Sequence, residues 1–254
     1  MGNVAIEIIK AVNVTKKFGD FIAVNDVSLS IYQHETLGMI GPNGAGKTTF
    51  SNIITGFFPP DEGSVHFEGG KITGTSPEKI VAMGIVRTFQ LVRVFDNLKV
   101  YENMGLSYFR KKYGGSFPVR MFTSKLDSPG IREKVDEILK VFALERLANE
   151  YAGNMSLGNK KKLEIAMAFI TDPKVLTLDE PFAGLSDREI DEIIAIIKPH
   201  GKNKTIFLIE HKISKLLQLV DRLVVLHEGR VVASGGPEET LQDPEVRRVY
   251  WKIK

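Results

Sequence analysis

Apolar and polar side chains alternate in three short stretches of the first 70 residues. These stretches are 6–12, 23–31 and 64–67, and Gly69 and Gly70 supply a turn after the third. Because successive side chains of a strand point to opposite faces, a period of two predicts strands that bury one face. The N-terminal region is therefore predicted to be rich in β-strands.

The apolar positions change to a helical spacing between about residues 100 and 170. Val135, Ile138, Leu139 and Phe142 recur in this way, and so do apolar positions within 163–170. This spacing predicts amphipathic helices.

Short apolar runs alternate with a helix after residue 170. Runs at 175–178, 205–209 and 222–226 flank a helical pattern at 189–197. Such alternation is typical of a parallel sheet covered on both faces. We therefore predict an α/β fold whose core is divided between residues 1–99 and 171–254, with a helical insertion at 100–170.

Composition and charge change this picture little. The 254 residues are 43% hydrophobic, include no cysteine and carry a formal net charge of +3. Without cysteine, disulfide and thiolate chemistry are excluded, and so small a charge does not favour nucleic acid as a partner. No apolar run approaches the ~18 residues of a membrane span, and the first residues do not resemble an export signal. We expect a soluble intracellular protein.

The most informative motif is a glycine-rich loop. It fits G-x-x-x-x-G-K-[ST] and lies between a predicted strand at 35–40 and a predicted helix at 49–55. Glycines let the backbone wrap around a polyphosphate, Lys47 adds a positive charge, and the Thr48 hydroxyl can bind Mg²⁺. Backbone N–H groups and the helix start then face the anion. The residues predicted to hold the nucleotide are Gly41, Pro42, Asn43, Gly44, Ala45, Gly46, Lys47, Thr48 and Thr49.

Two carboxylates follow the apolar run 175–178. Asp179 and Glu180 end this predicted strand, at the edge where parallel sheets bind ligands. Asp179 can hold Mg²⁺, and Glu180 can polarise a water for attack on the γ-phosphate. Many strands end in acidic residues, so this pair indicates a nucleotide site only because a phosphate loop lies upstream.

Three further polar residues are candidates for the same site. Gln90 follows residues 85–89 and His211 follows 205–210. Each is an ordinary surface residue unless its strand ends beside the phosphate loop. Ser156 precedes a helical pattern at 160–169. A serine there serves as an N-cap, and the exposed helix start can also bind an anion.

These motifs, in this order, resemble the ATP-binding subunits of ABC transporters over nearly the whole chain. The resemblance implies a P-loop NTPase core with a mainly parallel sheet, an N-terminal antiparallel β subdomain and an inserted α-helical subdomain that carries the family's signature. It also implies hydrolysis of ATP with Mg²⁺ as cofactor. By resemblance, the catalytic residues are Glu180, His211 and Gln90, and the metal residues are Thr48, Gln90 and Asp179.

The resemblance also identifies residues that contact the nucleotide away from the loop. Phe18 matches the aromatic residue that stacks on adenine, with Phe21 as a competitor and a buried strand residue as the alternative. Ser156 and Gly158 match the signature, which the family usually writes Leu-Ser-Gly-Gly-Gln and this chain writes Met-Ser-Leu-Gly-Asn at 155–159. In addition, Ser186 stands where the family commonly has aspartate.

Partners follow from the same resemblance. The signature of one subunit closes on the ATP of another, so we expect a dimer with a second ATPase subunit, either the same chain or a paralogue. We also expect integral membrane permease subunits, indirectly a solute-binding protein, and no nucleic acid. This places the protein at the cytoplasmic face of the cell membrane as a peripheral subunit.

The subtype is most similar to importers of branched-chain amino acids. The cues are residues 84–90, the long segment after Asn103 and the C-terminal residues 243–250. Importers of urea, amides or other amino acids stay open, and so does a non-transport ABC ATPase. A small-molecule kinase would share the glycine loop but not the remaining motifs in this order.

Residues 105–130 combine glycines, aromatics and basic side chains. This composition fits a surface loop, and it equally fits contact with a membrane-embedded partner or lipid headgroups.

Overall fold

The computed structural model describes residues 6–113 and 128–251, which form two compact units. Unit 1 comprises Met1–Arg87, Lys174–Glu180 and Ile197–Lys254, and unit 2 comprises Thr88–Pro173 and Pro181–Ile196. The segment predicted as a contact region at 105–130 lies largely outside the described residues, since 114–127 are not described.

Unit 1 begins with an antiparallel sheet in the strand order β2-β1-β4-β5. One face of this sheet is buried, as the alternating pattern predicts, and includes Val14, Val24 and Val65. The strands are β1 (Glu7–Phe18), β2 (Phe21–Tyr32), β4 (Glu62–Phe67) and β5 (Gly70–Lys71).

The second sheet of unit 1 has the order β10-β9-β3-β8-β7-β6 and is parallel except for its edge strand β10. All residues of β3, β7 and β8 are buried, which explains why these strands read as continuous apolar runs. The strands are β3 (Thr36–Ile40), β6 (Ile85–Arg87), β7 (Val175–Asp179), β8 (Thr205–Ile209), β9 (Arg222–His227) and β10 (Arg230–Gly235).

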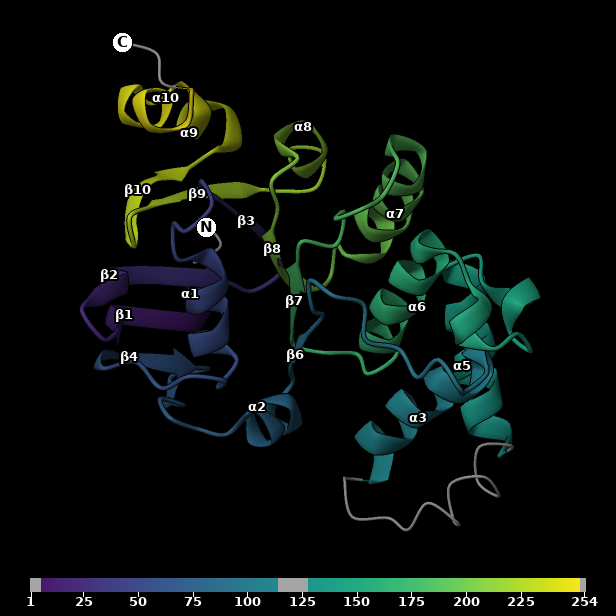
Figure 1. The fold of residues 1–254 in the computed structure, drawn as a ribbon. Coiled ribbons are helices and arrows are strands. Elements are labelled where there is room, and N and C mark those ends of the chain that lie inside the picture. Colours follow the sequence, from purple (N-terminus) through teal and green to yellow (C-terminus); the bar gives the residue numbers. More distant parts are fainter. Residues whose placement is uncertain (1–5, 114–127, 252–254) are drawn as a thin grey trace, which may run out of the picture. The chain divides into compact units, whose positions relative to one another are not determined.

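Helix α1 (Lys47–Ile54) joins the cores of the two sheets (Figure 1). Phe50, Ile53 and Ile54 belong to one hydrophobic cluster that also contains residues of both sheets. The ring of Phe50 lies edge-on to that of Phe207 in β8, with 6.2 Å between the ring centroids, within the range of about 4.5–7 Å that is usual for such pairs. Buried packing of this helix therefore fixes the loop that precedes it at the edge of the parallel sheet.

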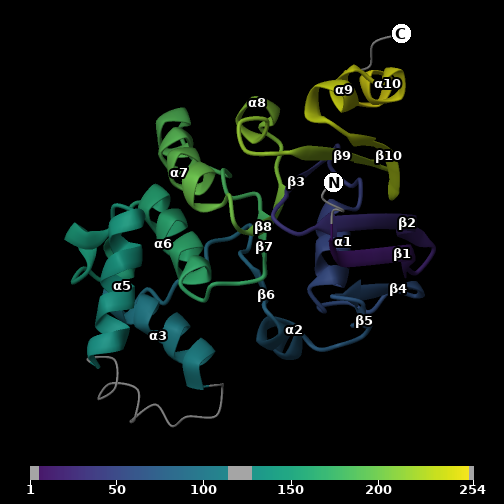
Figure 2. The ribbon, with the colours of Figure 1, turned by 180° about the vertical axis from the view of Figure 1, so that it is seen from behind.

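The remaining helices of unit 1 are short. Helices α9 and α10 lie together beside β10, as both ribbon views show (Figures 1 and 2). These helices are α2 (Pro77–Met83), α8 (Ile213–Leu216), α9 (Pro237–Gln242) and α10 (Pro244–Trp251).

Unit 2 is helical. Helices α3 (Val100–Tyr113), α5 (Pro129–Val141) and α6 (Leu157–Phe169) pack on one another, and the rings of Phe142 and Phe169 meet edge to face at 5.4 Å. Two 3₁₀ turns lie at Glu145–Leu147 and Ala152–Asn154. Helix α7 (Asp187–His200) starts in unit 2 and ends in unit 1.

The predicted fold class is confirmed: an antiparallel β subdomain precedes a mainly parallel sheet, and a helical unit interrupts the core. The boundaries predicted at residues 99/100 and 170/171 stay predictions. Within 6–113 and 128–251, none of the helices is long and apolar enough to cross a membrane.

Candidate nucleotide site

The glycine loop connects β3 to α1, as the motif requires. Gly46 caps the helix with φ of 101°, a backbone conformation that favours glycine. A Cβ there would also lie 2.2 Å from the carbonyl oxygen of Ala23, so close backbone packing excludes a side chain. The first N–H groups of α1 have no partner within the helix and point toward its N-terminal end, where an anion is stabilised.

Lys47 is buried within this loop. Its Nζ donates to the carbonyl oxygens of Gly41 at 2.7 Å and Pro42 at 3.0 Å. Burial lowers the pKa of the Lys47 ammonium, while the carboxylates of Glu180 and Asp179 act in the opposite direction. An incoming polyphosphate would give this desolvated cation a strong anionic partner.

Glu180 and His211 form a pair at the carboxyl edge of the parallel sheet. The Nε2 atom of His211 lies 3.0 Å from Oε1 of Glu180, and the two residues follow the neighbouring strands β7 and β8. The backbone N–H of Glu180 donates to Ile209. Glu180 has φ of 48°, an uncommon conformation for a non-glycine residue and one enriched at functional sites. The histidine therefore holds a carboxylate that the backbone already orients.

Asp179 offers an oxygen that suits a metal ion. The side chain is almost fully buried, and its Oδ2 accepts a hydrogen bond from Arg87 at 2.5 Å. Its other oxygen, Oδ1, is buried and has no hydrogen-bond partner among the residues that the structure describes. Carboxylate and hydroxyl oxygens are suitable Mg²⁺ ligands, and Thr48 lies in the first turn of α1. Asp179 and Thr48 thus fit the predicted metal, to which phosphate and water would supply further ligands.

The predicted site residues are divided between the two units. Unit 1 contains the loop 41–49, Phe18, Asp179, Glu180 and His211, whereas unit 2 contains Gln90, Ser156 and Gly158. The side chain of Gln90 is exposed, and its backbone oxygen accepts a hydrogen bond from Lys161.

Ser156 and Gly158 are held by specific packing within unit 2. Ser156 is the N-cap of α6, and its Oγ accepts the N–H of Asn159 at 3.3 Å. A Cβ on Gly158 would come within 2.3 Å of the Glu189 carboxylate. Ser186 donates its Oγ–H to that same carboxylate at 2.7 Å and caps α7 in return. A serine in place of the usual aspartate therefore keeps a capping role here.

A buried ion pair near Gln90 was not predicted from the sequence. Lys161 Nζ donates to the carbonyl oxygens of Phe89 and Gln90, and Glu164 accepts the N–H groups of Phe89 and Arg93. Burial raises the pKa of Glu164, and Lys161 opposes this shift. The two charges fix the backbone on both sides of Gln90. The sequence did contain a signal for this pair, because the charged residues Lys161 and Glu164 lie within the apolar pattern of α6.

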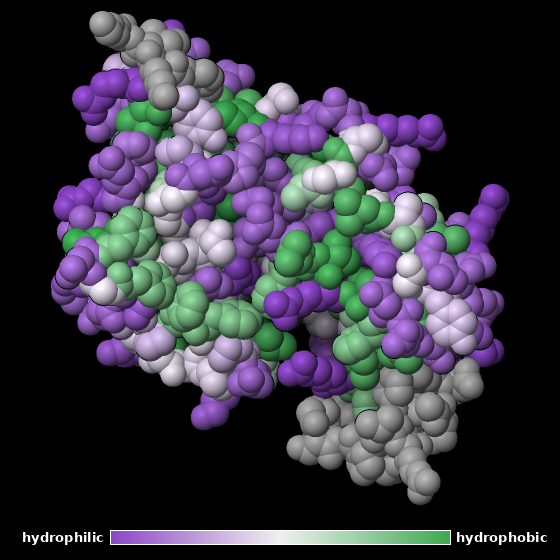
Figure 3. Space-filling model, in the orientation of Figure 1, coloured by the Kyte–Doolittle hydropathy of each residue, from purple (hydrophilic) through white to green (hydrophobic). Residues whose placement is uncertain are grey.

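Phe18 lies on the surface of unit 1. It is 46% exposed and meets Phe58 edge to face at 5.7 Å, and Lys16 Nζ lies 5.7 Å from its ring centroid. The buried alternative is therefore excluded, while Phe21, 60% exposed, stays a competitor. In the space-filling view, apolar residues gather over the region of β1 and β2 in unit 1 (Figure 3).

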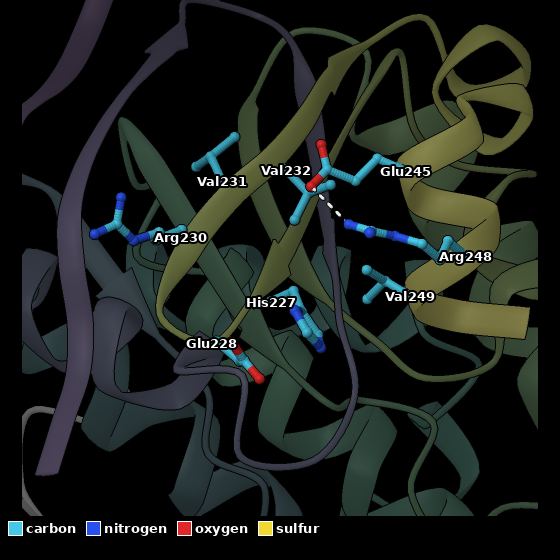
Figure 4. A pocket seen from close by; sticks show the side chains of 8 residues that line it. All are labelled: His227, Glu228, Arg230, Val231, Val232, Glu245, Arg248 and Val249. Atoms are coloured by element: carbon cyan, nitrogen blue, oxygen red, sulfur yellow. Dashed lines mark hydrogen bonds and ion pairs between the residues drawn. The ribbon is translucent and has the colours of Figure 1, made fainter. Parts of the chain in front are cut away.

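A separate pocket of about 520 Å³ lies between the β9–β10 hairpin and α10 (Figure 4). Its lining includes Glu228, Glu245 and Arg248 but none of the predicted site residues, and Arg248 is paired with Glu245. Tyr250, two residues after Arg248 in α10, forms a hydrogen bond with the backbone of Gly41. Burial raises the pKa of the Tyr250 phenol. Helix α10 thus contacts the first glycine of the phosphate loop.

Comparison with known proteins agrees with this geometry. The sequence model of the ABC transporter family matches residues 24–183. The high-affinity branched-chain amino acid transport ATP-binding protein LivG of Escherichia coli (strain K12) is 39% identical over 244 residues, covering 92% of this chain and 93% of LivG. A probable branched-chain amino acid transport ATP-binding protein LivG of Methanocaldococcus jannaschii is 35% identical over 253 residues, covering 96% and 97%.

Solved structures show the same fold. A nucleotide-free ATP-binding cassette from an ABC transporter has a TM-score of 0.82 and 34% identity, and the match covers 96% of this chain and 99% of that one. A dimeric cassette in a post-hydrolysis state, bound to ADP and Pi, has a TM-score of 0.75 and 27% identity over 91% and 99% of the chains.

Fold and site together define an ATP-hydrolysing protein of the P-loop class. The chain belongs to the ABC transporter family, as the sequence predicted. The roles of the individual site residues stay predictions, and two experiments test them, while a third tests the buried Glu164.

Glu180→Gln is expected to keep ATP binding and to lower the hydrolysis rate by about 10²- to 10⁴-fold, because a general base is lost. Steady-state phosphate release measures this, with equilibrium binding of ATP as the second readout. Glu228→Gln is the matched control, since Glu228 also follows a strand and has φ of 46°. Near-normal hydrolysis by Glu180→Gln would exclude Glu180 as the base.

Phe18→Ala is expected to weaken ATP binding roughly 5- to 150-fold, the equivalent of about 1–3 kcal/mol of base stacking. Isothermal titration with ATP measures the dissociation constant, and Phe21→Ala serves as the control with little change. If Phe21→Ala weakens binding and Phe18→Ala does not, the adenine platform is Phe21.

The buried Glu164 predicts a pH dependence of stability. Its pKa is raised in the folded protein, so the unfolded chain loses this proton first. The contribution of Glu164 to the free energy of unfolding is complete below pH ~4.5. It is lost as the pH rises through the pKa that Glu164 has in the folded protein. Urea denaturation should therefore show Glu164→Gln gaining stability relative to wild type as the pH rises from ~4.5.

The surface residue Glu192 provides a control whose effect on stability should have the opposite pH dependence. The hydrogen bond from Lys162 lowers the pKa of its carboxyl, so its contribution is lost as the pH falls through the folded pKa. A Glu164→Gln difference that is independent of pH would contradict the burial argument.

Proposed function

We propose that this chain is the ATP-hydrolysing subunit of an importer of branched-chain amino acids. The observation that carries ATP hydrolysis is the convergence of Lys47, Asp179, Glu180 and His211 at one edge of the parallel sheet of unit 1. The solute class rests on the relatives, LivG among them, that are named as branched-chain amino acid transport proteins.

Each residue has a defined task in the proposed reaction. The loop 41–49 and Lys47 would bind the phosphates, and Thr48, Asp179 and Gln90 would hold Mg²⁺. When bound, Mg²⁺ neutralises charge on the phosphate oxygens. Glu180 accepts a proton from the attacking water, and His211 keeps the carboxylate in place.

The working unit is proposed to be a dimer that binds two ATP molecules. Ser156 and the start of α6 present a helix N-terminus, which is suited to the γ-phosphate of a second subunit's nucleotide. The solved dimeric cassette bound to ADP and Pi supports this arrangement. Hydrolysis removes the bridging phosphate, so nucleotide state controls whether the dimer is closed.

The remaining partners follow from the transport role. The second ATPase subunit is the same chain or a paralogue, and permease subunits provide the path for the solute. A solute-binding protein acts indirectly through them. The chain would then be peripheral at the cytoplasmic face of the membrane. Importers of other amino acids, amides or urea are the alternatives, because the ATPase does not contact the solute and indicates it only through kinship.

The test is transport by a reconstituted complex. The chain is co-purified with candidate permease subunits, inserted into vesicles and supplied with a matching binding protein. We expect ATP-driven uptake of leucine, isoleucine and valine, and none when the chain carries Glu180→Gln. Uptake of a different solute alone would contradict the proposed substrate class while leaving ATP hydrolysis intact.

A further inference from the structure

Arg87 connects two parts of the candidate site. It is the last residue of β6, and its register partner in β7 is Thr177. Residues two apart on a strand share a face of the sheet, so Arg87 lies on the same face as Asp179. Its Nη2 donates to Oδ2 of Asp179 at 2.5 Å, and only 6% of the Arg87 side chain is exposed.

The other arm of the guanidinium contacts the phosphate-loop helix. Nη1 donates to Oδ1 of Asn52 at 2.5 Å and to Oγ1 of Thr55 at 3.2 Å, at the C-terminal end of α1. The ring of Phe57 covers the group, with 5.6 Å between Cζ and the ring centroid. One planar cation therefore ties α1 to the strand that ends in Asp179.

The two carboxylate oxygens of Asp179 differ in their hydrogen bonding, and this difference carries the inference. Arg87 donates to Oδ2, whereas Oδ1 is buried and, within residues 6–113 and 128–251, has no hydrogen-bond partner. A buried carboxylate oxygen without a partner is costly, and such atoms in native structures call for a ligand or a functional reason. A cation at Oδ1 would satisfy it.

We infer that Arg87 is a positioning residue for Mg²⁺: it holds Oδ2 of Asp179 and anchors α1, so that Oδ1 stays oriented for the metal of the bound nucleotide. This inference rests on the proposed Mg²⁺–ATP site. Groups that orient a metal-binding carboxylate commonly change metal affinity or activity by about 10- to 100-fold when removed.

Arg87→Met tests the inference through the Mg²⁺ dependence of nucleotide binding. The dissociation constant of a non-hydrolysable ATP analogue is measured with excess Mg²⁺ and again with EDTA. We expect the gain in affinity that Mg²⁺ gives the wild type to shrink about 10-fold or more, while the affinity in EDTA stays close to wild type. Arg87→Lys should recover only part of the gain, because one ammonium cannot serve both α1 and Asp179 as a forked guanidinium does.

The matched control is Arg222→Met. Arg222 is also a partly buried arginine in the same sheet, donating to Glu35 at 2.8 Å and to the carbonyl oxygen of Ser30. It begins β9, at the opposite edge of the parallel strands. Both variants should lower the urea midpoint, but Arg222→Met should leave the Mg²⁺ gain unchanged.

The outcomes separate this inference from the proposed function. If wild type binds the analogue without any Mg²⁺ gain, the proposed metal site itself is wrong. If wild type shows the gain and Arg87→Met retains it, only the role of Arg87 is wrong. Equal loss of affinity with Mg²⁺ and with EDTA would also overturn the inference, because it would show general support of the loop.

Discussion

Four charged side chains of unit 1 are held together in a largely buried environment, and the candidate site depends on their balance. Lys47 and Arg87 supply the positive charges, and Asp179 and Glu180 supply the negative ones. Burial of such groups is costly unless each has partners. The parallel sheet solves this by delivering strand ends to one edge, where a cation on one strand meets an acid on the next. The arrangement leaves one carboxylate oxygen and one desolvated ammonium ready for a metal and a phosphate.

Buried charged groups also have partners in unit 2, where helices rather than strands supply them. Its buried pair Lys161–Glu164 fixes the backbone beside Gln90, and the Ser186–Glu189 cap lies directly against Gly158. Charged and capping groups therefore hold the two segments of unit 2 that are predicted to contact the nucleotide. Leu157 and Asn159, which depart from the usual signature, take no part in these side-chain contacts, and Gly158, against which Glu189 packs, is retained.

Much of this could be predicted from the sequence. Fully buried strands such as β7 and β8 read as apolar runs, and the glycine loop lies between a strand and a helix because only that context satisfies its backbone. The pairing of Arg87 with Asp179 could not be predicted, because it depends on the order of β6 and β7 in the sheet. The exposure of Phe18 depends likewise on how the β1–β2 hairpin packs. Spacing along the chain does not reveal which strands are neighbours.

Binding of Mg²⁺–ATP by the loop 41–49, Asp179 and Glu180 can be seen in a crystal structure with a non-hydrolysable analogue and Mg²⁺. Lys47 Nζ now bonds the carbonyl oxygens of Gly41 and Pro42. We predict that it bonds a phosphate oxygen in the complex and that Oδ1 of Asp179 faces the metal. A nucleotide bound elsewhere, or Lys47 still bonded only to those two carbonyl groups beside a bound nucleotide, would show that this loop and these carboxylates do not form the Mg²⁺–ATP site.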